Sequence, residues 1–303
     1  MRAAAFMEPG GPEVLRLMEL DAPQAGPGQV RVRVRAAGVQ PVDCAVRAGA
    51  FPSGSAPGEP TIPGNELAGQ IDQVGEGVTG FSVGDHVLGY RPLQAYAAHA
   101  VVPADQIVAK PADMPWAVAG GFSAAAQTAH IALQELAVGA GDTLLVHAAA
   151  GAVGSMAVQL AAHRGATVIG TARETNHAYL RQLGAVPVTY GHGLADRVRH
   201  AAPGGVDAAL DGAGGDALQV SLDLAPAPDR VLTLVEHARA GELGVRTTPN
   251  LRSAARLAAL VELHTAGALE VHIRRTYPLA QAAEAHRAVE SRHGPGKVVL
   301  TVD

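Results

Sequence analysis

The pattern of hydrophobic and polar residues changes near residue 115 of this 303-residue chain. Before that point, apolar segments are short and are interrupted by Gly and Pro. Residues 29–36 alternate strictly, with Val30, Val32 and Val34 on one side and arginines on the other, which predicts a half-buried strand with a solvated outer face. Further short strands are predicted at 70–74, 85–90 and 97–102. The first third should therefore form a compact β-rich domain.

After residue 115, helical patterns alternate with short apolar strands, as in βαβ units that form a parallel sheet. A long helix is predicted over 251–266, with Asn250 as its N-cap and Gly267 as its end. The chain should finish with a helix near 279–291 and a strand over 297–302. The apolar strands are 143–147, 166–170, 206–210 and 230–235.

Composition narrows the classes of protein. A net charge of −5 gives no electrostatic reason to expect binding to nucleic acid or to a membrane surface. No apolar run approaches the roughly 20 residues that span a bilayer, and the first residues lack the apolar core of a signal peptide. We therefore expect a cytoplasmic protein. The single cysteine, Cys44, excludes an internal disulfide and a multi-cysteine zinc site, and we interpret it as a packed thiol.

The sharpest local signal is TLLVHAAAGAVGSMAVQLA at 143–161, which predicts a buried strand, a turn and a helix. The turn carries Ala148-x-x-Gly151-x-x-Gly154. Small residues let backbone N–H groups approach a pyrophosphate, and the helix N-terminus adds unpaired donors and the positive end of its dipole. The pattern is not a strict G-x-G-x-x-G, and an ordinary tight turn is the alternative. The predicted cofactor contacts are Ala149, Gly151, Ala152, Val153 and Gly154.

The second predicted strand ends at Gly170 and is followed by Thr171-Ala172-Arg173. Sites selective for NAD commonly carry an acidic residue here, which accepts from the ribose 2′-OH. Thr171 and Arg173 would instead surround a 2′-phosphate, since a charge-assisted hydrogen bond contributes about 1.5–3 kcal/mol. Glu174 is the competing observation, because its carboxylate would reach the ribose or repel a phosphate. We predict NADPH as the cofactor.

Seven segments together resemble the medium-chain dehydrogenase/reductase superfamily, in its zinc-free quinone oxidoreductase branch. They span nearly the whole chain and include AAGVQPVDCAVRAG, IPGNELAGQIDQVGEGVTGFSVGDHV, QAYAAHAVVPADQIVAKP, VHAAAGAVG, GVDAALDGAGG, YPLAQAAEAHRAVES and GKVVLTV. The resemblance implies an α/β fold in which residues 1–120 and 266–303 form a GroES-like β-rich domain. Residues 121–265 would form an inserted Rossmann domain with a doubly wound parallel sheet. It also implies a homodimer with its active site in a cleft between the domains.

The resemblance implies further cofactor contacts around the Rossmann domain. These are Thr128 near the nicotinamide or its ribose, His177 and Tyr190 at the 2′-phosphate or adenosine, Ala213, Gly214 and Val235 beside the nicotinamide, and Gly296 with Lys297 from the C-terminal segment.

The zinc enzymes of the superfamily carry a Cys and a His–Glu pair at the catalytic metal. In this chain Gln40 stands in place of the Cys, and Asn65 stands in place of the His before Glu66. Only one possible ligand remains, whereas a catalytic zinc usually has three protein ligands. We therefore predict no metal, and we interpret Glu66 as a structural residue or a polar wall of the cleft.

The chain departs from the family pattern at two positions of the predicted substrate pocket. Quinone oxidoreductases usually have Asn in place of Gln40, and many have Tyr in place of Ala45. Gln40 is the first candidate donor to the oxygen that becomes negative after hydride attack, and Lys297 is the second. A packing or cofactor-facing role for Gln40 is equally open, and packing is the alternative for each tyrosine. The predicted pocket residues are Ala45, Asn65, Tyr90 and Tyr96.

Together with these residues, the resemblance implies a zinc-independent, NADPH-dependent reductase that transfers a hydride to a quinone or a conjugated enone. Its partner would be this small molecule, with no nucleic acid or membrane. One alternative is an enoyl or polyketide-type reductase for a bulky biosynthetic intermediate. Another is a protein that binds NADPH without turnover.

Overall fold

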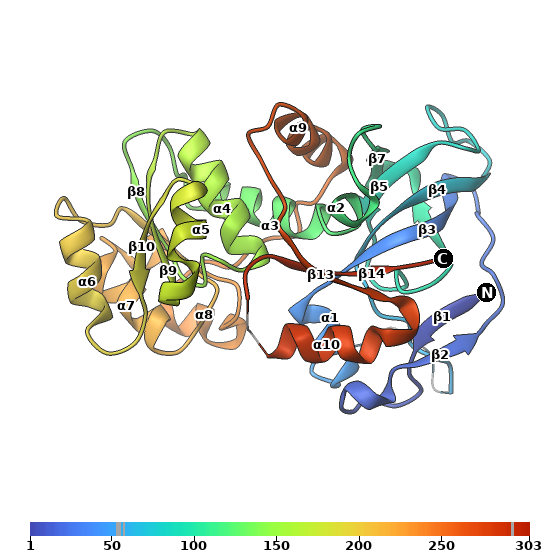
Figure 1. Cartoon of the computed structure of the whole chain (residues 1–303), viewed down its shortest axis with the longest axis horizontal. Helices are drawn as coiled ribbons and strands as arrows, with labels where there is room; N and C mark the ends of the chain where they lie inside the picture. Colours follow the sequence, from blue (N-terminus) through green and yellow to red (C-terminus); the bar gives the residue numbers. More distant parts are fainter. Residues whose placement is uncertain (53–55, 57, 292–293) are drawn as a thin grey trace.

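The computed structural model describes residues 1–52, 56, 58–291 and 294–303. It has two lobes side by side, each built on its own sheet (Figure 1). We call them the parallel-sheet lobe and the mixed-sheet lobe. Both chain ends lie in the mixed-sheet lobe, where Arg2 Nη2 donates to the carbonyl of Asp303 at 2.9 Å. This is the predicted α/β architecture, although the domain boundaries at 120 and 265 stay predictions.

Seven strands form the mixed sheet, and all but the β13–β14 pair are antiparallel. As predicted, Val30, Val32 and Val34 of β3 are buried in the core. Val298 pairs opposite Val39, so the closing strand completes a lobe that the first third of the chain begins. The order is β13 (Ile273–Pro278), β14 (Lys297–Thr301), β3 (Gln29–Val39), β4 (Glu66–Val74), β5 (His86–Tyr90) and β7 (Ile107–Ala109), with β6 (His99–Pro103) also on β3.

Smaller elements complete this lobe. The strands β1 (Arg2–Ala5) and β2 (Arg16–Glu19) form a separate two-stranded ribbon. The helices are α1 (Pro41–Arg47), α2 (Trp116–Gly120) and α10 (Ala282–Glu290). Short 3-10 turns lie at Pro12–Val14, Ala104–Gln106 and Leu279–Gln281.

Five parallel strands form the other sheet. The order is β10 (Ala185–Thr189), β9 (Thr167–Ala172), β8 (Thr143–Val146), β11 (Ala208–Asp211) and β12 (Val231–Thr233). The chain enters at the central strand β8, winds outward through β9 and β10, and then crosses to β11. Ligands of open α/β sheets bind beyond the carboxyl ends of the strands at such a switch point. This order therefore places a binding site at the ends of β8 and β11.

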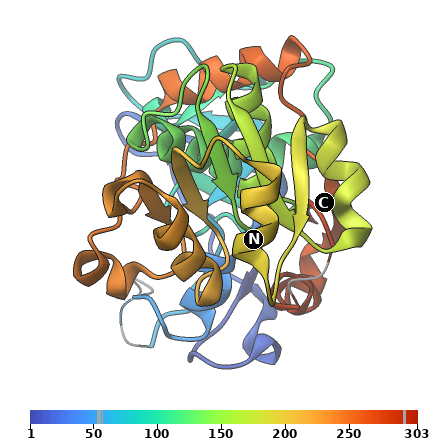
Figure 2. The same ribbon diagram turned by 90° about the vertical axis from the view of Figure 1, so that its left-hand side faces the viewer.

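Both faces of the parallel sheet are covered by helices (Figure 2). Alternate residues of a strand point to opposite faces, so Leu144 and Val146 join one apolar cluster whereas Leu145 joins another. The first cluster contains residues of α3 (Ser123–Glu135), α4 (Ala152–His163), α5 (His177–Gln182) and α9 (Ala254–Thr265). The second contains residues of α6 (Leu194–Ala201), α7 (Asp216–Leu224) and α8 (His237–Leu243). Within the described residues, no helix is long and apolar enough to cross a membrane.

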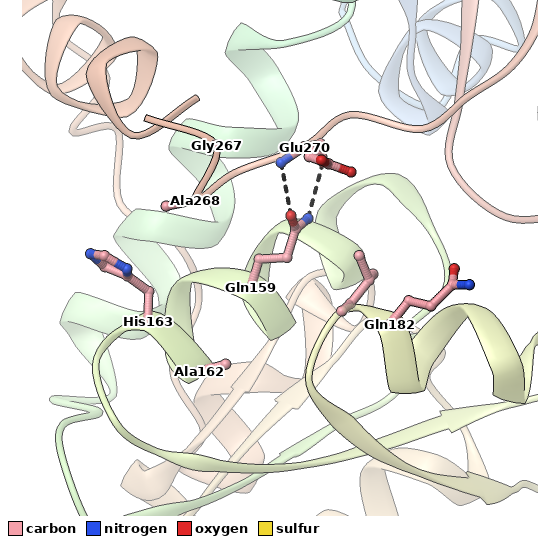
Figure 3. A pocket seen from close by; sticks show the side chains of 8 residues that line it. Gln159, Ala162, His163, Gln182, Gly267, Ala268 and Glu270 are labelled. Atoms are coloured by element: carbon pink, nitrogen blue, oxygen red, sulfur yellow. Dashed lines mark hydrogen bonds between the residues drawn. The ribbon is translucent and has the colours of Figure 1, made fainter. Parts of the chain in front are cut away.

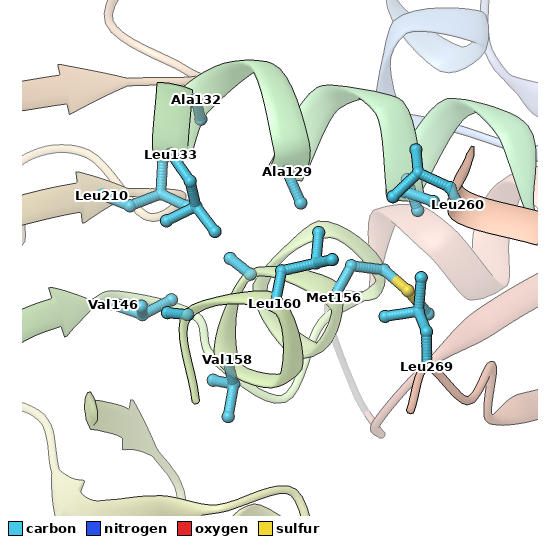
Figure 4. Packing of buried hydrophobic residues seen from close by; sticks show 14 of the residues in the cluster. Ala129, Ala132, Leu133, Val146, Met156, Val158, Leu160, Leu210, Leu260 and Leu269 are labelled. Carbon is cyan, nitrogen blue, oxygen red and sulfur yellow. The ribbon is translucent and has the colours of Figure 1, made fainter. Parts of the chain in front are cut away.

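Small side chains let α3 lie close against α4. Ala129 and Ala132 of α3 leave room for Met156 and Leu160 of α4 beneath them (Figure 4). All four side chains are at most 3% exposed. This packing fixes α4, and with it the turn at its N-terminus, relative to α3.

The helix predicted over 251–266 begins later than expected. Asn250 is not its N-cap, because α9 starts at Ala254 and the hydroxyl of Ser253 accepts from Arg256 N at 3.1 Å. Ser253 N also donates to Gln127 Oε1 at 3.0 Å, which ties the start of α9 to α3. Gly267 follows the helix with φ +75°, so its predicted role as the helix end is confirmed.

Candidate functional site

The turn between β8 and α4 fits a diphosphate. Gly151 is the N-cap of α4, and the amides of the first helical turn have no intrahelical acceptor. A Cβ on Gly154 would lie 2.4 Å from the carbonyl oxygen of Ala148 and 2.8 Å from Ala149 Cα, so only glycine keeps this tight path. Ala148 takes the left-handed conformation at φ +55°, which is uncommon for a residue with a Cβ. The turn thus brings free N–H donors to the switch point of the sheet.

The C-terminal segment lies against this turn. Gly296 N donates to the carbonyl of Ala150 at 2.9 Å, and Gly296 forms an isolated bridge with Gly151. Gly296 has φ +79°, and a Cβ there would meet the carbonyl oxygen of His272 at 2.2 Å. A glycine at 296 therefore lets the segment that leads into β14 reach the turn.

Three of the predicted 2′-phosphate residues gather beyond the ends of β9 and β10. Arg173 Nε donates to Tyr190 Oη at 2.9 Å, and His177 Nε2 lies 3.5 Å from Thr189 Oγ1. Arg173, His177 and Tyr190 all retain contact with solvent. The other guanidinium N–H groups of Arg173 make no hydrogen bond within the described residues, and groups of this kind bind phosphate well.

Thr171 is not part of that group, because its side chain is only 2% exposed. Its Oγ1 lies 3.1 Å from His147 Nδ1, and its carbonyl accepts from Ala149 N at 3.1 Å. Burial lowers the pKa of His147 to about 4, so the imidazole is neutral. Thr171 therefore supports the turn from inside, and the predicted side-chain contact with a phosphate is wrong.

Asp211 shapes the loops beyond β11 and β12, and the sequence interpretation missed it. Its Oδ1 accepts from Ala213 N at 2.9 Å and Gly214 N at 2.8 Å, and its Oδ2 accepts from Thr233 Oγ1 at 2.8 Å. Thr233 Oγ1 in turn accepts from Val235 N at 3.2 Å. An Asp before Gly-x-Gly at a strand end is the signal of such a turn. The predicted nicotinamide neighbours thus lie on two loops locked to one carboxylate.

Gln40 and Lys297 meet at the carboxylate of Glu66. Gln40 Nε2 donates to Glu66 Oε1, Lys297 Nζ forms an ion pair with the same oxygen at 2.6 Å, and Ala124 N donates to Oε2 at 2.7 Å. A Cβ on Gly38 would lie 1.9 Å from Glu66 Oε1, so this glycine makes room for the carboxylate. Glu66 and Lys297 are 0% and 1% exposed, so Lys297 cannot donate directly to a substrate.

Asp43 is a second buried carboxyl group that the sequence interpretation missed. It completes a capping box at the start of α1, where Oδ2 accepts from Gln40 N at 2.8 Å. The same oxygen accepts from Tyr96 Oη at 2.9 Å, and Oδ1 accepts from Asn65 Nδ2 at 3.2 Å. Burial raises the pKa of Asp43 to about 6, against the lowering effect of the hydrogen bond from Gln40 N. Asp43 therefore fixes the backbone from which the Gln40 side chain extends.

The four predicted pocket residues differ in their exposure to solvent. Tyr96 is 0% exposed, and its ring packs against Gly64 and His286, so it is a core residue and the prediction that it lines the pocket is wrong. Asn65 is buried and bound to Asp43. Ala45 on α1 and Tyr90 at the end of β5 remain partly exposed.

The residues in the zinc positions do not offer a metal-binding set. Gln40 and Asn65 carry amides, whereas zinc is bound by thiolate, imidazole and carboxylate. Glu66, the one carboxylate, is already paired with Lys297. Across the part of the chain that the structure describes, no cluster of three His, Cys, Asp or Glu residues is arranged for a metal.

A separate pocket of about 330 Å³ lies between α4, α5 and the segment before β13 (Figure 3). Gln159 braces one wall, since its Nε2 donates to the carbonyl of Glu270 at 3.0 Å and its Oε1 accepts from Glu270 N at 2.8 Å. None of the predicted site residues lines it.

Comparisons with known proteins match both lobes. The model of the alcohol dehydrogenase GroES-like domain matches residues 26–126, and that of the zinc-binding dehydrogenase domain matches residues 183–300. The chain is 35% identical to a 2-haloacrylate reductase of Burkholderia sp, over 98% of each protein. It is 34% identical to a quinone oxidoreductase of Pseudomonas aeruginosa, over 97% of this chain and 98% of the relative. A segment of the spectinabilin polyketide synthase system protein NorB of Streptomyces orinoci is also 36% identical to this chain. The match covers 97% of this chain and 14% of that protein.

Solved structures agree with these relatives. A mycobacterial protein in complex with NADPH is 33% identical, with a TM-score of 0.87 over 99% of this chain and 100% of the other. The quinone oxidoreductase of Escherichia coli, also in complex with NADPH, is 26% identical with a TM-score of 0.88 over the same shares.

Proposed function

Because this chain belongs to the quinone oxidoreductase branch of the medium-chain dehydrogenase/reductase superfamily, we propose that it reduces quinones or conjugated enones with NADPH and without zinc. It is an NADPH-dependent oxidoreductase, like its full-length relatives and the NADPH-bound neighbours. The observation that carries the proposal is the turn at Ala148–Gly154, where free amides meet the Gly296 segment.

The residues of the parallel-sheet lobe would hold the cofactor from end to end. The α4 turn would bind the diphosphate, Arg173 with Tyr190 and His177 the 2′-phosphate, and the loops held by Asp211 would border the nicotinamide. Thr128 of α3 would approach the nicotinamide or its ribose from the side opposite these loops. When bound, NADPH supplies a hydride to an electron-poor carbon of the acceptor, and a solvent proton completes the product.

Gln40 would act on the oxygen that becomes negative when the hydride is transferred. Glu66 accepts one N–H of its amide and thereby orients the group, which leaves the second N–H for the substrate. Lys297 forms a buried ion pair with Glu66 and is itself withdrawn from the surface, so we assign it a positioning role. Preorganised donors of this kind need no reorganisation during the reaction.

Absorbance at the nicotinamide band tests the function. Protein dialysed against EDTA should oxidise NADPH when 1,4-naphthoquinone or a simple enone is added, at the rate of undialysed protein. A rate that falls on dialysis and returns with zinc would contradict zinc independence. Tight NADPH binding without oxidation by any acceptor would favour the alternative of a binding protein without turnover.

A second candidate is the reduction of enoyl groups on bulky intermediates. It is favoured by the match to a segment of a polyketide synthase protein and by the small Ala45 on α1. Oxidation of NADPH by long-chain enoyl thioesters, with no activity on quinones, would support it. We also propose that the protein is a homodimer, as the family resemblance implies, and that it is cytoplasmic, as its composition predicts.

A further inference from the structure

Arg252 lies in the segment that leads into α9 and reaches across to α3. Its Nη2 donates to Thr128 Oγ1 at 3.4 Å, and the next residue, Ser253, holds the segment in place through Gln127. Thr128 is the residue expected beside the nicotinamide. The guanidinium therefore lies at the edge of the proposed reaction site, although the family resemblance assigned no role to this position.

The charge of Arg252 is not neutralised by a direct partner. Burial lowers its pKa, while Glu66 and Asp43 act on it from a distance to raise the pKa. Both carboxylates are already committed: Glu66 to Lys297, and Asp43 to the amide of Gln40 and the hydroxyl of Tyr96. In the described ranges, no carboxylate lies within 4.0 Å of the Arg252 guanidinium.

Two other arginines with limited exposure do have a carboxylate partner. Arg31 forms an ion pair with Asp72 at 2.8 Å, and Arg47 forms one with Glu290. A guanidinium carries five N–H donors in a planar fork that matches a carboxylate. Arg252 uses one of them in a single long bond. A partly buried cation with spare donors beside a reaction site is arranged to receive an anion.

We propose that Arg252 binds the carboxylate of the substrate, so that conjugated acids are preferred acceptors. This inference rests on the proposed function and names its substrate class. Hydride addition at the β-carbon of such an acid moves the electron pair of the double bond toward the carboxylate, and a solvent proton then adds at the α-carbon. The charge on the carboxylate oxygens increases in that step. Arg252 both selects the acid and stabilises the developing charge.

A matched pair of substrates isolates this contact. NADPH oxidation is measured with 2-chloroacrylate and with its methyl ester, which differ in the charge that Arg252 would bind. In Arg252→Gln, kcat/KM for the acid should fall on the order of 10- to 100-fold, whereas kcat/KM for the ester changes less than about threefold. Arg252→Lys should recover part of the loss, because it restores the charge without the fork.

Arg256→Gln is the control. This residue lies in the first turn of α9, four positions after Arg252, and contacts His130 and Gln134. Its substitution removes the same charge. Its acid-to-ester ratio should equal that of the wild type. An Arg252→Gln ratio that also equals the wild type would overturn the proposal. Equal losses for acid and ester would do the same, since they would indicate a cofactor or folding role.

A binding measurement separates this proposal from the proposed function. Calorimetric titration of 2-chloropropionate into the NADPH-loaded protein should give saturable heat in the wild type and none in Arg252→Gln. Reduction of quinone and ester without reduction or binding of the acids would overturn the role of Arg252 and leave the proposed function standing. Binding of the acid without reduction of any acceptor would keep the anion site and overturn the proposed function.

Discussion

Glu66 has its carboxylate held by an ammonium, a side-chain amide and a backbone amide, all inside the protein. Removing one partner of a buried ion pair costs about 3–5 kcal/mol, because the other charge is left without compensation. The arrangement is therefore stable only as a unit. Two further ionisable groups interact with Glu66 through their charges. Asp43 is a titratable carboxyl group, and Arg252 is a cation without an ion-pair partner.

At Arg173, reversal of charge should change the preference for the cofactor. In Arg173→Glu, the affinity for NADPH should fall at least about tenfold, while that for NADH should change less than about threefold, because only NADPH carries the 2′-phosphate. Fluorescence titration with both dinucleotides measures the two constants. Arg199→Glu, which has the same charge change on exposed α6, should behave like the wild type. Equal losses for both dinucleotides would remove the 2′-phosphate assignment.

Asp43 should make stability depend on pH. Its pKa is about 6 in the folded protein, against 3.8 for an unperturbed carboxyl, so the folded state binds more protons between these values. Stability contributed by this group is therefore lost as the pH rises from about 4 to about 6. Asp43→Asn cannot titrate, so the free energy of unfolding of the wild type should decline relative to this variant, on the order of 2–3 kcal/mol.

Urea unfolding of both proteins between pH 4 and 7 tests this difference. The lowered pKa values of His147 and His286 make stability rise with pH, but this effect is common to both proteins and cancels in the comparison. Parallel stability curves would show that Asp43 does not titrate in this range.

At the scale of secondary-structure elements, the unit formed by β8 and α4 must meet two structural requirements. Its helix must pack through Met156 and Leu160 against α3, and its first turn must leave amides free. The position of the turn is thus set by the packing of the helix that follows it. The Gly296 segment, far away in the chain, closes the other side of the turn.

Two glycines in helices should respond oppositely to alanine. Gly154→Ala places a Cβ 2.4 Å from a carbonyl oxygen. The free energy of unfolding should therefore fall by about 1–3 kcal/mol, and NADPH should bind at least about tenfold more weakly. Gly241 in α8 has no atom within 4 Å of an added Cβ. Gly241→Ala should therefore gain roughly 0.5–1 kcal/mol and keep its NADPH affinity. Thermal unfolding measures the stability of both variants, and NADPH titration measures their affinity. A Gly154→Ala variant with the stability and affinity of the wild type would argue against the tight turn.

For the whole molecule, two sheets built from interleaved parts of the chain place the site at their junction. The mixed-sheet lobe contributes Glu66, Gln40 and Lys297, and the parallel-sheet lobe contributes the turn at Ala148–Gly154. The bond between Gly296 and Ala150 links the two directly.

The assembly proposed from the family resemblance predicts a mass in solution. Sedimentation equilibrium should give about twice the chain mass of 30.8 kDa across micromolar concentrations. Oligomers of soluble proteins are most often two-fold dimers, which supports this expectation. A single species at the mass of one chain would contradict it.

The amino-acid sequence by itself determined the change from a β-rich part to alternating strands and helices, and the small-residue turn at Ala148–Gly154. Alternation at Val30–Val34 and the small residues from Ala148 to Gly154 depend on near neighbours, so a local pattern suffices to predict them. The prediction that no zinc is bound likewise comes from the sequence, from the amides of Gln40 and Asn65.

Only the tertiary structure decided which side chains meet. Lys297 and Glu66 are 231 positions apart, and no local pattern shows that they form a buried pair. The burial of Tyr96 and Thr171, the cap at Ser253 and the position of the Arg252 guanidinium beside Thr128 also depend on contacts between distant segments. Burial and pairing are properties of the packed chain, whereas turn and strand propensities belong to short segments.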